Sequence, residues 1–224
     1  MKKITILMIL VFSIFSCDDI LKEVPKDRLS EANFYKTVSD GRAAVDAIYG
    51  VLSAGQLFAH QYLLQIEIPA DFAYGRGSTI PIGGEYTGLD AVNQRRVGLM
   101  WDYFYQAVNY ANIAIEKIPG IEGDESAKSL LVAEAKFLRA LCYYHLVRDF
   151  GAVPLRLNST DGDMARTPVA DVYNAVIADL QAAESGLPAS ITVYGRPSKW
   201  GAKIMFAQVY LPLGDWAKAR YKAK

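Results

Sequence analysis

The sequence of 224 residues has few of the side chains on which enzyme active sites and metal sites depend. Its two cysteines and two histidines are Cys17, Cys142, His60 and His145. The G-x-S-x-G, H-E-x-x-H and Walker motifs, which mark esterases, zinc proteases and phosphate-binding loops, are absent. We therefore predict a protein that is not an enzyme, with no catalytic residue, no metal site and no cofactor.

The sequence also has no excess of charge of either sign. Lysine and arginine together number 24, and so do aspartate and glutamate. Proteins that bind nucleic acid need a basic surface to neutralise phosphates. We therefore expect no nucleic-acid partner.

Long apolar runs are scarce, and the clearest one lies at the N-terminus. Ile4–Phe15 follows two lysines and is shorter than the roughly 20 apolar residues that a membrane span requires. Ser16 and then Cys17 follow it, and two aspartates come after Cys17, so the segment resembles a bacterial lipoprotein signal whose cysteine is acylated. An ordinary secretory signal is the alternative. We predict a signal peptide at 1–16, a lipidated Cys17 with a tether at 17–29, and a helical domain at 30–224.

The best-defined helical pattern lies in the segment Glu134–Leu155. Apolar residues recur there at intervals of three and four, and Gly151 and Pro154 mark its end. Three charged residues, Glu134, Lys136 and Arg139, interrupt the apolar run. We therefore predict an amphipathic helix at the centre of an all-α domain.

Other helices are predicted from their end signals. Trp101–Ile118 has a broad apolar face, and in the pattern around Arg166–Pro188 we expect Thr167 to cap and Pro168 to occupy the first turn. Ser39 and Ser198 are the expected caps of two more helices. Four residues near the C-terminus have the spacing that is typical of a tetratricopeptide repeat, and part of the same pattern recurs on the central helix. Such repeats form helical hairpins that stack on one another. Those four are Ala207, Tyr210, Gly214 and Ala219.

Several polar residues fall where a structural role is expected. Cys142 and His145 lie on the apolar face of the central helix, which favours a buried thiol and a hydrogen-bonded core histidine. Asn112 falls in an apolar stripe, so its amide needs partners or costs about 1 to 3 kcal/mol. Glu67 and Asp71 form one carboxylate pair, for which we favour a solvated or capping role over that of a glycosidase pair.

The segment 56–96 is predicted to be a long irregular loop, because glycines interrupt it and aromatic residues are interleaved with them. Aromatic planes can cover sugar rings, and planar polar groups can bind pairs of hydroxyls. The candidate ligand-binding residues are Phe72, Tyr74, Arg76 and Tyr86. The alternative is that these aromatic residues attach the loop to the helices.

Five segments between Cys17 and the C-terminus carry a resemblance to a known family. They are Cys17, the tryptophan helix with Asn112, EAKFLRALCYYHLVRDFGAVPL, Arg166 with DVYNAVIADLQAA, and Gly195 and Arg196 before a helix that ends at Gly214–Trp216. In this order they resemble the front half of SusD/RagB nutrient-binding lipoproteins. Lys136, where the family usually has arginine, and Pro212, near the end of its helix, depart from the pattern.

The resemblance implies a tetratricopeptide-like helical scaffold, anchored to the outer membrane through lipid and exposed at the cell surface. It also implies capture of an oligosaccharide, or of a peptide in the RagB-like branch, and handover to a TonB-dependent transporter of the SusC kind. Because the family's binding loops vary, it assigns no individual sugar-binding residue here. The alternative function is a general protein-interaction or peptide-binding scaffold. Since only the front half is matched, we expect the chain to be truncated at its C-terminal end.

Overall fold

The computed structural model describes residues 34–70, 73–77, 88, 90–191 and 193–223. The predicted signal peptide, Cys17 and most of the short helix expected between Ser30 and Tyr35 lie outside the described residues. Apart from Phe34, everything described belongs to one compact unit that starts at Tyr35.

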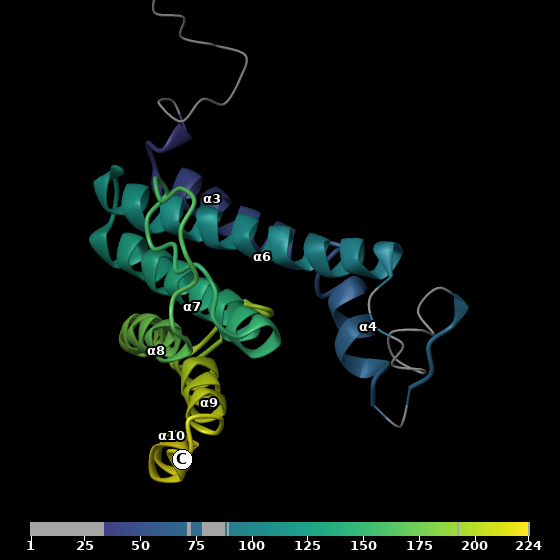
Figure 1. The fold of residues 1–224 in the computed structure, drawn as a ribbon. Helices are drawn as coiled ribbons and strands as arrows, with labels where there is room; N and C mark the ends of the chain where they lie inside the picture. The colour runs from purple at the N-terminus through teal and green to yellow at the C-terminus, as the bar shows by residue number, and fades with distance from the viewer. Residues whose placement is uncertain (1–33, 71–72, 78–87, 89, 192, 224) are drawn as a thin grey trace, which may run out of the picture. The chain divides into compact units, whose positions relative to one another are not determined.

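The described residues form α-helices joined by turns and loops, and no β-strand (Figure 1). In chain order the helices are α3 Val38–Leu52, α4 Gln61–Glu67, α6 Ala91–Lys117, the 3-10 turn η2 Ile118–Gly120, α7 Glu125–Phe150, α8 Val169–Gly186, α9 Lys199–Tyr210 and α10 Trp216–Lys222. Two isolated bridges, Thr37 with Glu122 and Val153 with Thr167, are the extended pairings found among them. The all-α prediction is confirmed.

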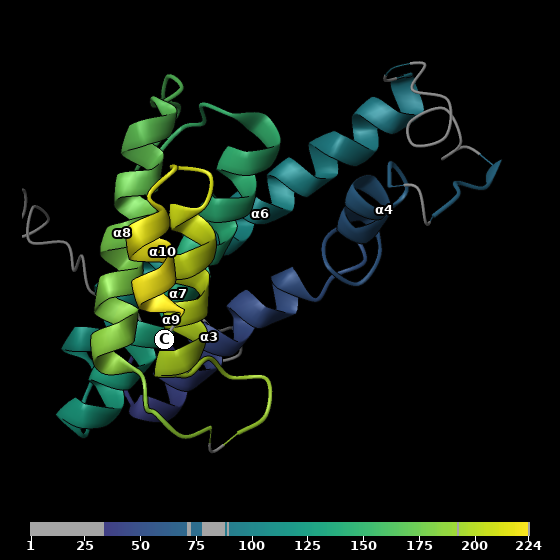
Figure 2. The same cartoon turned by 90° about the horizontal axis from the view of Figure 1, so that it is seen from below.

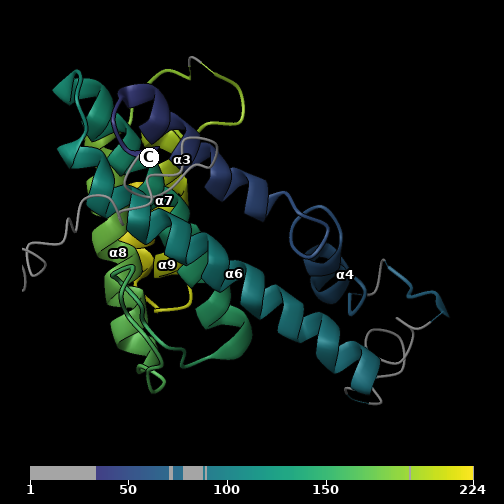
Figure 3. The same cartoon turned by 90° about the horizontal axis from the view of Figure 1, so that it is seen from above.

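Helix α7 is the centre of the unit. It packs against α3, α6 and α8, and the series continues from α8 to α9 and from α9 to α10 (Figure 2). Helices α3 and α6 also lie side by side (Figure 3). Each helix therefore covers the apolar face of the next, as in the predicted stack of helical hairpins.

Several predicted helix ends are confirmed. Asp124 accepts a hydrogen bond from the Ala127 amide at the start of α7, and Ser198 accepts one from the Gly201 amide at the start of α9. Gly151 ends α7 with a φ of 72°, a value that favours glycine. These signals act within one helical turn, so the local sequence determines them.

Two predicted caps are wrong. Thr37, and not Ser39, caps α3, because Thr37 and Asp40 form a reciprocal pair of hydrogen bonds there. Thr167 does not cap α8: its amide donates to the Val153 carbonyl, and Pro168 precedes the helix as the cap residue. In the second case the helix begins one residue later than expected, and the Thr167 backbone pairs with a segment distant in sequence.

The long irregular loop predicted at 56–96 is shorter in the structure. Helix α4 occupies part of it, and α6 begins at Ala91, ten residues before the predicted start at Trp101. Asp90 caps this extension through the Asn93 amide. The first turns of α6 carry few apolar residues, so periodicity alone did not reveal them.

The amphipathic character predicted for the central helix is also wrong. Glu134 and Arg139, expected on a polar face, are only 3% and 6% exposed. Helix α7 is covered by neighbours on several sides, so both charges lie inside the protein with partners described below. The expected apolar stripes are only partly buried, since Leu138 and Val176 lie in the core, Leu141 is half-buried and Leu130 is 37% exposed.

Gly186 at the end of α8 provides a test of the close packing between α7 and α8. A Cβ at this position would lie 2.6 Å from the Cβ of Ala133, which is too close for either helix to accommodate without moving. We expect Gly186→Ala to lower the free energy of unfolding by about 1 to 3 kcal/mol, measured by urea denaturation. The matched control is Gly98→Ala, because a Cβ there meets no atom within 4 Å. This control should raise stability by up to about 1 kcal/mol, and equal effects of the two substitutions would contradict the packing explanation.

Candidate ligand-binding site

Two of the four predicted ligand-binding residues, Tyr74 and Arg76, lie among the described residues, whereas Phe72 and Tyr86 lie outside them. Tyr74 is 77% exposed, so its ring does not attach the loop to the helices. Arg76, two residues on, is also exposed. Both side chains are therefore accessible; aromatic planes can cover sugar rings, and guanidinium groups can bind hydroxyls.

The helix that precedes Tyr74 is held by a buried polar contact. The Tyr62 hydroxyl of α4 lies 2.6 Å from Nδ1 of His145 on α7. The rings of Phe58 and Phe104 surround the imidazole, with centroid distances of 5.3 and 5.9 Å. The prediction of a hydrogen-bonded core histidine is confirmed, and the contact links α4 to the central helix.

Burial has a clear electrostatic effect on His145. Its pKa is lowered from 6.5 to about 4, first because burial disfavours the charged ring and then because Arg148 is close. The imidazole is therefore neutral at pH 7. A group that stays neutral to such low pH cannot serve as a general base that cycles through a protonated form near neutrality.

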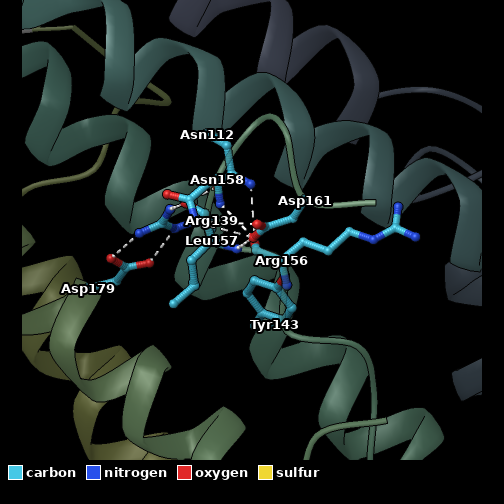
Figure 4. Close-up of polar contacts among 8 residues, drawn as sticks. All are labelled: Asn112, Arg139, Tyr143, Arg156, Leu157, Asn158, Asp161 and Asp179. Carbon is cyan, nitrogen blue, oxygen red and sulfur yellow. Dashed lines mark hydrogen bonds and ion pairs between the residues drawn. The ribbon is translucent and has the colours of Figure 1, made fainter. Parts of the chain in front are cut away.

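A buried polar cluster joins three helices (Figure 4). The Arg139 guanidinium of α7 donates to both carboxylate oxygens of Asp179 on α8, at 2.7 and 2.8 Å. It also donates to the side-chain oxygen of Asn112 on α6 at 2.8 Å. Asn112 in turn donates to the Arg156 carbonyl at 3.2 Å. The predicted structural role of Asn112 is confirmed, because its amide oxygen and nitrogen both have partners.

The same cluster fixes the loop that follows α7. Arg139 donates to the Leu157 carbonyl at 3.0 Å, and the Tyr143 hydroxyl both donates to the Arg156 carbonyl and accepts from its amide, each at 2.7 Å. Asp161 accepts from the amides of Leu157 and Asn158. These side chains satisfy backbone groups, so the cluster is structural.

A second polar network surrounds Glu134 on α7. Its carboxylate accepts from Arg42 at 2.7 Å, from the Tyr49 hydroxyl at 2.6 Å and from Arg196 at 3.0 Å. Asp46 pairs with both arginines. Burial by itself would raise the pKa of Glu134, but these hydrogen bonds and charges outweigh it and lower the pKa. Glu134 is thus held ionised inside the protein.

None of these clusters offers a metal or redox site. Within the part of the chain that the structure describes, no group of three or more His, Cys, Asp or Glu side chains could hold a metal ion. Cys142 is buried, and its pKa is raised to about 12, so its thiol is unreactive at neutral pH. Glu67 ends α4 as the last residue of a helix, and Asp71 lies outside the described residues.

Reasoning from the sequence did not predict the buried polar contacts that Glu134 and Arg139 of α7 make with other helices. A signal for one of them was available, because Arg139 falls in line with Ala135, Cys142 and Leu146, which are all buried. A charged residue in an otherwise apolar stripe indicates a buried pair. Spacing could not identify Asp179 as its partner, because the two residues lie 40 positions apart.

Comparisons with known proteins agree with this architecture. Residues 83–211 match the SusD-like family, described as starch-binding and associating with the outer membrane. This match covers more than half of the sequence. The chain belongs to the SusD-like family. The family is one of binding proteins, which confirms the prediction that the chain is not an enzyme.

Individual relatives show both the likeness and its limit. The chain is 32% identical to SusD-like protein P2 of Formosa agariphila, over 100% of this chain and 46% of the relative. A laminarin-binding SusD-like protein has a similar structure, with a TM-score of 0.76, 28% identity and coverage of 84% of this chain and 43% of that one. A SusD superfamily protein from Bacteroides thetaiotaomicron gives a TM-score of 0.72 at 25% identity, with coverage of 83% and 45%. The chain thus spans about half the length of these SusD-like proteins.

The described helices of this SusD-like chain include none that combines the length and the apolar character needed to cross a bilayer.

The buried pair between α7 and α8 can be tested by removing one or both charges. Arg139→Met leaves the Asp179 carboxylate buried without its cation, and we expect a loss of about 3 to 5 kcal/mol in the free energy of unfolding. Arg139→Met combined with Asp179→Leu should be more stable than the single variant, because no buried charge remains. Urea denaturation measures both. Lys218→Ala, which breaks an exposed pair with Asp215, is the control and should have no measurable effect. A single variant as stable as this control would contradict the structural role of the pair.

His145 predicts a pH dependence of stability. Between about pH 6.5 and pH 4 the unfolded chain takes up a proton on this residue and the folded chain does not, so stability falls as the pH falls. The depressed pKa of about 4 corresponds to a loss of about 3 kcal/mol over this range. His145→Gln keeps a hydrogen-bonding group for Tyr62 but does not titrate, so its stability should change less between pH 7 and pH 4.5. Denaturation at the two pH values measures the difference. Asp149, whose own pKa is raised by burial, interacts with Tyr62, so both proteins are also compared with Asp149 replaced by asparagine. Parallel pH profiles would contradict the assignment.

Proposed function

We propose that the chain is part of an outer-membrane nutrient-binding lipoprotein that captures oligosaccharides for a SusC-like TonB-dependent transporter. The observation that carries the proposal is the match of residues 83–211 to a family described as starch-binding and associating with the outer membrane. The laminarin-binding relative supports a glycan as the ligand class. Acylation of Cys17 would supply the membrane anchor, with the domain facing outward from the cell.

The proposed ligand surface is the loop that contains Phe72, Tyr74, Arg76 and Tyr86. The exposure of Tyr74 supports it, because a large aromatic side chain in water is available to cover the apolar face of a sugar ring. Arg76 adds donors that can bind adjacent hydroxyls. The contact from Tyr62 to His145 holds α4, which precedes this loop in the chain, against α7.

Binding of this kind would be capture without bond breaking. One aromatic plane adds about 0.5 to 1.5 kcal/mol beyond the area that it buries, so a few planes give an affinity weak enough for release. A ligand held in this way could pass to the transporter. A transporter partner and a lipid anchor are part of the proposal and are not needed for the binding itself.

The experiment that tests this function is a titration of the chain with starch-derived and laminarin-derived oligosaccharides and with a panel of peptides. We expect Tyr74→Ala to weaken oligosaccharide binding by about 3- to 10-fold, which corresponds to the loss of one aromatic plane. Tyr221→Ala is the matched control, because Tyr221 is 73% exposed but lies on α10, far along the chain from this loop. Calorimetry measures both affinities.

Three outcomes are distinguishable. Equal affinities for Tyr74→Ala and Tyr221→Ala, and no loss in Phe72→Ala or Tyr86→Ala, would remove this loop from the binding surface. Binding of peptides but not of oligosaccharides would favour the peptide-binding scaffold. Release of reducing ends from a polysaccharide would contradict a function in binding alone.

A further inference from the structure

Helix α4 lies beside α6 and is short, and a single one of its side chains is buried (Figure 1). Tyr62 is 3% exposed, whereas Leu63 and Ile66 of the same helix are 45% and 42% exposed. Ile68, directly after the helix, is the next buried residue. Because an isolated helix shorter than about 12 residues is marginal in water, α4 depends on its contacts with other segments. Its attachment therefore rests chiefly on Tyr62.

Tyr62 is held by a cluster of aromatic rings. Its ring has centroid distances of 5.1 Å to Phe58, 5.6 Å to Phe104 and 5.0 Å to His145, each in an edge-to-face arrangement. Its hydroxyl lies 2.6 Å from Nδ1 of His145. The side chain that attaches α4 thus contacts a group on α7 that can gain a charge.

The titratable and charged groups around the imidazole lie on α4, α7 and α8. Tyr62 is the one from α4. On α7, the Tyr144 ring lies 5.5 Å from the imidazole, and Arg148 lies over that ring and donates to its hydroxyl. Asp149 interacts with the Tyr62 hydroxyl, and Tyr173 of α8 lies near Tyr144 and Arg148. Helix α6 and the turn before α4 present phenylalanine rings, which carry no charge.

A proton on the imidazole conflicts with this arrangement. It places a positive charge among apolar rings and close to Arg148, and these two effects lower the pKa of His145 from 6.5 to about 4. If α4 moves away, water reaches the imidazole and its pKa returns towards 6.5. As the pH falls between these two values, the proton therefore favours the open form. Asp149 acts in the opposite direction, because burial raises its pKa and so favours the attached form in acid.

We propose that Tyr62 and His145 form an acid-sensitive latch, which releases α4 from α6 and α7 while the helices around α7 stay folded. The contacts differ in the way that this requires, because one buried side chain attaches α4, whereas α7 is packed against α3, α6 and α8. Release would also free the start of the segment that leads to Tyr74, which lies seven residues after the end of α4 at Glu67. The proposal concerns α4 itself and does not depend on the proposed glycan binding.

Hydrogen exchange followed by mass spectrometry tests the latch. The protection factors of the α4 and α8 amides, corrected for the intrinsic exchange rate, are measured at pH 7 and pH 4.5. All proteins carry Asp149→Asn, which removes the opposing titration and keeps an acceptor near Tyr62. With pKa values of about 4 and 6.5 in the attached and open forms, the protection factor of α4 should fall by about 50-fold between the two pH values.

Two comparisons make this result specific. At pH 4.5 the α4 amides should be at least about tenfold less protected than those of α8, because α4 opens without global unfolding. With His145→Gln, which does not titrate, the protection factor of α4 should fall by less than about threefold. Equal protection of α4 and α8 at pH 4.5 would overturn the proposal. An equal fall with and without His145→Gln, or an α4 that is already unprotected at pH 7, would overturn it as well.

A second variant decides the matter if His145→Gln does not fold. Tyr62→Phe keeps the ring and removes the hydroxyl, and at pH 7 it should lower the protection factor of α4 by about 3- to 10-fold, as expected for the loss of one hydrogen bond. Tyr110→Phe is the matched control, because it removes an exposed hydroxyl on α6 that contacts Gln106. The same protection of α4 in the two variants would overturn the proposal.

Discussion

The contact between Arg139 and Asp179 constrains this fold more than any other polar interaction among the described residues. Two charges removed from water are tolerated only when their hydrogen bonds are well formed, so α7 and α8 must keep one register. Apolar helices packed by shape alone could slide by a turn at moderate cost. The further bond from Arg139 to Asn112 extends the constraint to α6.

Two more polar anchors lie along the same helix. Glu134 reaches α3 and the segment before α9 through Arg42 and Arg196, and His145 reaches α4 through Tyr62. Helix α7 is therefore a buried central helix that makes three sets of polar contacts, each with different neighbouring segments. This explains why a helix with buried charges can lie at the centre of the protein, since Glu134 and Arg139 each have partners.

The segment with Tyr74 and Arg76 combines an exposed ring with a cationic, planar group, which suits a ligand rich in hydroxyls. The groove lined by the end of α3, the middle of α7 and residues 195–197 differs from it, because it is apolar and its one arginine is occupied by Asp46 and Glu134.

The sequence by itself determined the helical class, the central helix and its ends at Asp124 and Gly151, because periodicity and capping act over a few residues. It also indicated Tyr74 and Arg76 as surface chemistry suited to sugars, but not the contact from Tyr62 to His145 that anchors the helix before them. Only the tertiary structure decided that Glu134 and Arg139 are buried, because a spacing pattern cannot show which charges will find partners far away in the chain. It likewise decided that the Thr167 backbone pairs with Val153 and that α8 begins one residue later than expected, with Pro168 as its cap residue.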